Sequence, residues 1–208
     1  MEKSIEQLVA VYKQHFSNRV VNLGPKFSQP IKDNNHMKAQ LYASYELLVE
    51  QRGGIATWDR MTTESIDAVT LWMYDDQHRW LLLYGSLGNG KTTMLKALKN
   101  IFPASVYYTA QQIYESFKYN ERLPDIPTAK MLLIDDLGTE PPQCKIFGED
   151  RTPITDLLLC RYSWPATTVI ATNLSFEDIQ ARYGDRLADR MSEMVSGIFY
   201  DSPSYRGR

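Results

Sequence analysis

The fold of this chain is decided by residues 81–93, which run LLLYGSLGNGKTT. Gly85, Gly90, Lys91 and Thr92 meet the pattern G-x-x-x-x-G-K-[ST]. The pattern predicts a buried strand, a phosphate-binding loop and a helix whose positive end faces the loop. The alternative is a Gly-rich turn that only caps a helix. An apolar run before the loop and a helical pattern after it favour the phosphate loop.

The residue types of this loop suit a nucleoside triphosphate and a magnesium ion. Glycines let backbone N–H groups turn inward around phosphate oxygens, and Lys91 can reach the β and γ phosphates. The hydroxyl of Thr92 is placed to ligate Mg²⁺. We therefore expect the loop to bind the nucleotide through Gly85, Ser86, Gly88, Asn89, Gly90, Lys91, Thr92 and Thr93.

Composition is that of an ordinary globular protein, with 208 residues, 43% hydrophobic and 23% charged. The net charge of −2 argues against a protein coated in positive charge for nucleic acid, although it allows a local basic channel. Cys144 and Cys160 are the only cysteines, and they give neither a zinc spacing nor a disulfide framework. Apolar runs stay well short of the length of a membrane helix, and no secretion signal follows Met1. These features predict a cytoplasmic protein without a membrane segment.

The N-terminal part is expected to be helical. Apolar spacing predicts helices near residues 5–16 and 37–48, separated by a turn-forming stretch at 22–35 and stopped by Gly53-Gly54. We assign residues 1–50 to a helical N-terminal region and 51–208 to the main domain. The first region is either a partner-docking appendage or a flank that packs on the main domain.

Beyond residue 60 the patterns alternate between helix and strand. Helices are expected from an N-cap at Thr62 or Thr63, after Lys91, at 111–120, from Thr152-Pro153, after Ser175 and at 184–191. Strands are expected at 81–84, 105–109, 131–134, 165–173 and 197–200, and a loop at 140–151. Such alternation predicts an α/β fold with a central parallel sheet flanked by helices.

A second decisive stretch, residues 130–138, runs KMLLIDDLG. Four apolar residues predict a strand covered on both faces, and two carboxylates follow it. In phosphate-loop enzymes the first acid after such a strand holds magnesium, so we assign this role to Asp135. Asp136 is left to orient or activate the attacking water. The alternative is an Asp pair that only makes a turn, and its place downstream of the phosphate loop favours the metal role.

Two further sites carry polar groups that suit phosphate chemistry. Asn173 ends a third buried strand, where it could hydrogen-bond the γ-phosphate or the water, or act only as a turn former. Arg186 and Arg190 lie four residues apart on one helix face. Ion pairs with Asp189 or Glu193 are the usual role of such arginines.

Together these motifs resemble the DnaC/DnaI helicase-loader and IstB transposition-ATPase group of AAA+ proteins over roughly residues 50–208. The specific motifs are the stretch DDLGTE at 135–140 and Ser204-Tyr205-Arg206. The resemblance implies a P-loop NTPase of the AAA+ ASCE type without a separate helical lid domain. It also implies ATP and Mg²⁺ as cofactors, Asn173 as sensor 1, Arg206 as sensor 2 and Arg190 as the arginine finger, with Arg186 as second choice.

The function implied by this resemblance is loading of a replicative helicase during DNA replication. ATP hydrolysis would be slow and stimulated by assembly or DNA, with the helicase, single-stranded DNA and further copies of the chain as partners. An IstB-like transposition helper is an alternative within the group. A nucleotide-dependent switch with little turnover is another, because Asp136 is shorter than the Glu that many AAA+ enzymes use there. The span between residues 109 and 131 is shorter than the region that this group often uses for binding DNA strands and for assembly.

Overall fold

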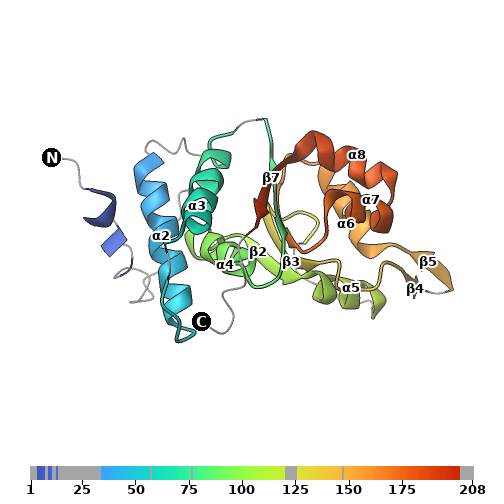
Figure 1. Cartoon of the computed structure of the whole chain (residues 1–208). Coiled ribbons are helices and arrows are strands. Elements are labelled where there is room, and N and C mark those ends of the chain that lie inside the picture. Colours follow the sequence, from blue (N-terminus) through green and yellow to red (C-terminus); the bar gives the residue numbers. More distant parts are fainter. Residues whose placement is uncertain are drawn as a thin grey trace.

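A computed structural model describes residues 4–7, 9–10, 13, 34–56, 58–75, 77–119, 126–146 and 148–201 of the chain. At its centre lies a sheet of five parallel strands in the order β2-β3-β6-β1-β7 (Figure 1). The strands are β1 (Trp80–Gly85), β2 (Val106–Thr109), β3 (Met131–Leu137), β6 (Thr167–Thr172) and β7 (Val195–Tyr200). The expected parallel sheet is confirmed.

Helices cover both faces of the sheet (Figure 1). One face carries α2 (Asn34–Glu50), α3 (Arg60–Trp72) and α4 (Lys91–Ile101). The other carries α5 (Ala110–Lys118), α6 (Pro153–Tyr162), α7 (Phe176–Tyr183) and α8 (Asp185–Met194). Because side chains alternate along a strand, Leu81 and Leu83 of β1 join the first core, whereas Trp80 and Leu82 join the second. This explains why the strands before the phosphate loop and before Asp135 are continuously apolar.

Two of the expected helix starts are confirmed. Ser175 caps α7 through a reciprocal capping box, in which its hydroxyl accepts from the N–H of Asp178 and the Asp178 side chain accepts from Ser175. Pro153 is the first residue of α6, where its missing N–H costs nothing. Thr152 occupies the N-cap position, but its hydroxyl bonds the Asp156 carboxylate instead of a backbone N–H.

Two expectations are corrected. Helix α3 begins at Arg60, and its N-cap is Asp59, whose carboxylate accepts from the N–H of Thr62 at 2.9 Å. Asp is a more favourable N-cap than Thr, so the ranking of capping residues agrees with the observed start of α3. The expected loop at 140–151 contains an antiparallel hairpin, β4 (Cys144–Ile146) with β5 (Glu149–Arg151). Three charged residues in a row gave β5 no apolar alternation to reveal it.

The end of the N-terminal region belongs to the same core as the sheet. Met37, Leu41 and Tyr45 of α2 are buried against α3 and α4. Of the helical pattern expected at 5–16, the described residues 5–7, 9–10 and 13 are helical. The turn-forming stretch expected at 22–35 lies outside the described residues up to 33. Where this region divides from the main domain stays a prediction, and no described helix is long and apolar enough to cross a membrane.

Candidate nucleotide-binding site

A cleft of about 570 Å³ opens where β1, β3 and β6 end. Ligands of open parallel sheets bind at this edge, because the loops that follow the strands converge there. One wall is the phosphate loop with the first turn of α4, and Asp135, Asp136 and Asn173 line the cleft with it. The cleft is also lined by residues that had not been predicted to bind a nucleotide: Tyr45, Val49, Arg52, Gly53, Gly54, Ile55, Ala56 and Thr62.

The course of the phosphate loop depends on its glycines. Gly85, Gly88 and Gly90 all have positive φ angles, of 125°, 80° and 99°. A Cβ atom on Gly85 would collide with the backbone oxygen of Tyr200 on β7, and one on Gly90 would collide with the Tyr45 hydroxyl on α2. The loop is therefore enclosed between β7 and α2.

Lys91 holds its ammonium group inside the loop. Its Nζ donates to the carbonyl oxygens of Gly85 at 2.9 Å and Ser86 at 2.5 Å, and to Oδ1 of Asn89 at 3.2 Å. Asn89 in turn donates from Nδ2 to Ser86 Oγ and to the carbonyl of Tyr200. The positive charge is thus fixed at the inner wall of the loop, in a side chain that is almost fully buried.

Asp135 meets the loop across the cleft. Its Oδ1 accepts from the Thr92 hydroxyl at 3.1 Å, and its Oδ2 accepts from the Tyr107 hydroxyl at 2.6 Å. Burial, helped by this hydrogen bond, raises the pKa of Tyr107, so the phenol remains a donor. Tyr107 lies in the strand expected at 105–109, but its contact with Asp135 was not predicted, because it depends on the register that pairs Thr109 with Asp135.

Asp136 and Asn173 bring two polar side chains to the floor of the cleft. Asp136 has a φ of 53°, the only positive value of a non-glycine among the described residues. The pairing of β3 with β6 is irregular between Ile134 and Leu137, so the chain turns Asp136 out of the strand pattern. Asp tolerates this left-handed conformation better than most residues.

Glu140 ties the loop after β3 to α7. It is 1% exposed, and its carboxylate accepts from the N–H of Gly138 at 2.9 Å and from the Tyr183 hydroxyl. Arg182 donates to the backbone oxygen of Glu140. Burial and the hydrogen bond to Glu140 raise the pKa of Tyr183. In the sequence Glu140 stood out only as the end of the DDLGTE motif, with no role.

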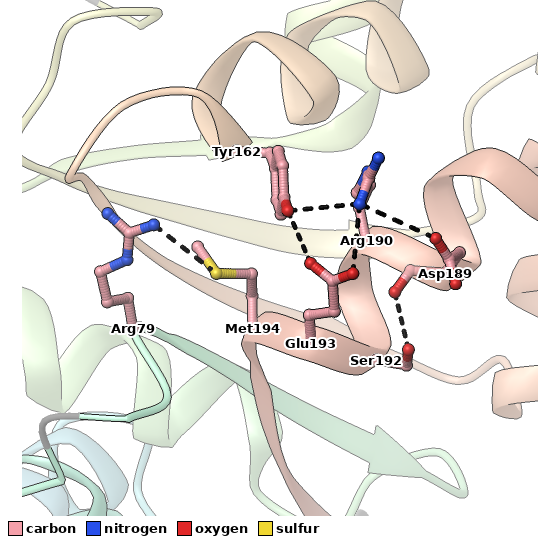
Figure 2. A network of polar contacts seen from close by, with 7 residues as sticks. All are labelled: Arg79, Tyr162, Asp189, Arg190, Ser192, Glu193 and Met194. Carbon is pink, nitrogen blue, oxygen red and sulfur yellow. Dashed lines mark hydrogen bonds and ion pairs between the residues drawn. The ribbon is translucent and has the colours of Figure 1, made fainter.

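Arg186 and Arg190 do not line this cleft. Figure 2 shows Arg190 on α8 beside Tyr162 and Glu193. Its Nη1 donates to Glu193 at 3.1 Å, and the guanidinium lies 5.0 Å from the centre of the Tyr162 ring, so the expected ion pair is present. Arg186 is exposed on the same helix, and Arg206 lies outside the described residues. The finger and sensor roles of these arginines stay predictions.

The sheet order, the phosphate loop after β1 and the acidic pair near the end of β3 define the fold of the AAA+ P-loop NTPases. Among the described residues no helix follows β7, so they include no separate helical lid.

Solved structures share this fold. The chain is similar to DnaI, with a TM-score of 0.58 at 19% identity, over 81% of this chain and 93% of that one. It is also similar to a replication initiator DnaA bound to AMPPCP and single-stranded DNA, with a TM-score of 0.51 at 21% identity, over 69% and 48% of the two chains.

AMPPCP-bound DnaA from Aquifex aeolicus gives a TM-score of 0.51 at 18% identity, over 70% and 49%. The chain thus spans about half the length of these DnaA chains. No family model and no curated protein matches the chain. At these identities the likeness establishes the fold.

Proposed function

We propose that the chain binds ATP with Mg²⁺ and hydrolyses it as an AAA+ ATPase. The observation that carries this proposal is the convergence of Lys91, Thr92, Asp135, Asp136 and Asn173 on one cleft. They come from three separate strand ends, and their residue types are those that phosphoryl transfer uses. Structures of DnaA with AMPPCP share this fold, which further supports a bound nucleotide.

The residues present fit a magnesium ion. The Thr92 hydroxyl and the Asp135 carboxylate are already in contact at 3.1 Å, and both are oxygen ligands of the kind that Mg²⁺ prefers. These two side chains would hold the ion, which would neutralise charge on the phosphates. The ammonium of Lys91 would exchange the carbonyl oxygens of the loop for phosphate oxygens.

Hydrolysis would depend on the polar pair at the floor of the cleft. Asp136 would orient or deprotonate the attacking water, and Asn173 would hold the water or the γ-phosphate. Arg190 of a neighbouring copy would stabilise the charge that develops on the transferred group. The reaction would therefore be slow in the single chain and faster on assembly or on DNA.

The biological role that fits best is loading of a replicative helicase. It is supported by the DDLGTE motif, which resembles that of the DnaC/DnaI group, and by the likeness to DnaI over 93% of that chain. The partners would be the helicase, single-stranded DNA and further copies of this chain, in the cytoplasm.

The test is phosphate release by the wild type and by the Asp136→Ala variant, with and without single-stranded DNA. Asp136→Ala is expected to lower the rate at least about a hundredfold while ATP still binds. Asp150→Ala, which removes an exposed carboxylate from β5, is the matched control and should leave the rate unchanged. Equal, near-zero rates in all three proteins would exclude hydrolysis and leave a nucleotide switch.

Two further measurements test the site and the role. Lys91→Ala should abolish ATP binding, and normal binding by this variant would contradict the assignment of the loop. Capture experiments with the full chain as bait should recover a replicative helicase in the presence of ATP. Recovery of a transposase instead would favour the transposition helper.

A further inference from the structure

Arg52 brings a second cation to the phosphate side of the cleft. It lies in the turn directly after α2 and lines the cleft together with the phosphate loop. Its Nη1 donates to the hydroxyl of Thr93 at 3.1 Å, across 41 residues of sequence. Thr93 is buried in the first turn of α4, next to Lys91 and Thr92. The guanidinium is therefore held at the beginning of α4.

A cation at the beginning of a helix stands at the wrong end of the helix dipole, so this position needs an anion. Helix α4 offers none of its own, because its first turn has no acidic residue and the cap Gly90 has no side chain. Lys91 adds a further positive charge at the same turn. Of the two carboxylates that line the cleft, that of Asp135 already accepts from Thr92 and Tyr107. A phosphate group would satisfy both the helix end and the guanidinium.

The position of Arg52 also indicates which phosphate it meets. The residues near Arg52 in the sequence that line the cleft are largely apolar, with Val49, Ile55 and Ala56, which suits a nucleoside. The guanidinium itself contacts Thr93 in the first turn of α4. Arg52 thus stands between the place for the nucleoside and the place for the phosphates.

We infer that Arg52 binds the phosphate next to the nucleoside, which both ATP and ADP carry, and so links the end of α2 to the nucleotide. This inference rests on the proposed function. Helix α2 gives Arg52 a fixed support, because the Ser44 hydroxyl accepts from Asn100 of α4 at 3.0 Å and the Tyr45 hydroxyl lies against Gly90. Nucleotide binding would then be transmitted to the N-terminal region through α2.

The experiment measures the affinity of the full chain for ATP and ADP with Mg²⁺ by calorimetry, and for adenosine by thermal shift. Arg52→Ala should weaken ATP and ADP binding by the same factor, about tenfold or more, and leave adenosine unchanged. Arg52→Lys keeps the charge but not the planar fork, so its affinities for ATP and ADP should lie between those of the wild type and of Arg52→Ala. Arg151→Ala removes an arginine from β5 and is the matched control, expected to bind like the wild type.

Unchanged ATP and ADP affinities in Arg52→Ala would overturn the inference. Loss of ATP affinity alone would place Arg52 on the γ-phosphate and overturn it as well. An equal loss for adenosine would show that Arg52 supports the nucleoside wall and binds no phosphate. If the wild type bound neither ATP nor ADP, the proposed function itself would fail, which is a separate outcome.

Discussion

Replacing Glu140 by alanine tests whether the contact between the loop after β3 and α7 stabilises the chain and positions Asp136, the residue proposed to act on the attacking water. The substitution removes the acceptor of two donors, the half-buried N–H of Gly138 and the buried hydroxyl of Tyr183. The buried hydroxyl left without a partner costs about 1 to 3 kcal/mol and the half-buried N–H about 1 kcal/mol, so the free energy of unfolding should fall by about 2 to 4 kcal/mol. For a chain of this size the melting temperature should then drop by at least about 4 °C.

The same substitution should slow phosphate release and leave ATP affinity nearly unchanged. Gly138 lies two residues after Asp136, so a loosened loop would misplace the Asp136 carboxylate relative to Asn173. Lys91 is held by the phosphate loop itself and should stay in place. Thermal unfolding and phosphate release would be measured for Glu140→Ala and Glu140→Gln.

Glutamine should retain most of both properties, because its carbonyl can accept from the Gly138 N–H while its amide donates to the Tyr183 oxygen. Glu149→Ala on the exposed strand β5 is the control, expected to change stability by less than about 0.5 kcal/mol. A melting temperature for Glu140→Ala within about 1 °C of the wild type would refute the reasoning.

Three further outcomes are expected. Gly90→Ala should lose about 1 to 3 kcal/mol of stability and most ATP affinity, because the φ of Gly90 is 99° and an added Cβ would collide with the Tyr45 hydroxyl. Adding Tyr45→Phe should recover part of the stability, and no recovery would rule out the collision. Arg161→Ala should cost at least about 3 kcal/mol in denaturant unfolding, since the buried guanidinium bonds four backbone carbonyls and the Thr168 hydroxyl, and a stable variant would contradict this. Arg190→Ala should keep its stability within about 1 kcal/mol and bind ATP, yet lose about a thousandfold in assembly-stimulated hydrolysis; full activity would remove the finger role.

Burial also explains a property of Arg161 that its position in the sequence hides. Taking the guanidinium out of water lowers the pKa of Arg161 to about 10. Its Nη atoms donate to the carbonyls of Ile126, Pro127, Ala129 and Thr167, which fastens the segment before β3 to the start of β6. An arginine followed by a tyrosine at the end of a helix gave no reason to expect this, because exposure is the usual state of arginine.

Local patterns predicted most of the fold. The strand, loop and helix around Lys91, the apolar strand before Asp135 and the cap at Ser175 were all found where the residue types indicated. Each depends on interactions between residues close in the sequence, such as capping, alternation and the φ freedom of glycine. The hairpin β4–β5 was missed, because its strands are short and charged and only their mutual pairing defines them.

The sequence by itself determined the phosphate loop, the acidic pair and hence the P-loop class of the fold, since spacing along the chain sets that chemistry. Only the tertiary structure decided that Tyr107 bonds Asp135, that Glu140 fastens the loop to α7 and that Arg52 reaches Thr93. These contacts join residues 28, 43 and 41 positions apart, and they depend on strand register and helix packing. Register and packing are set by the burial of the whole core, which no short stretch of sequence contains.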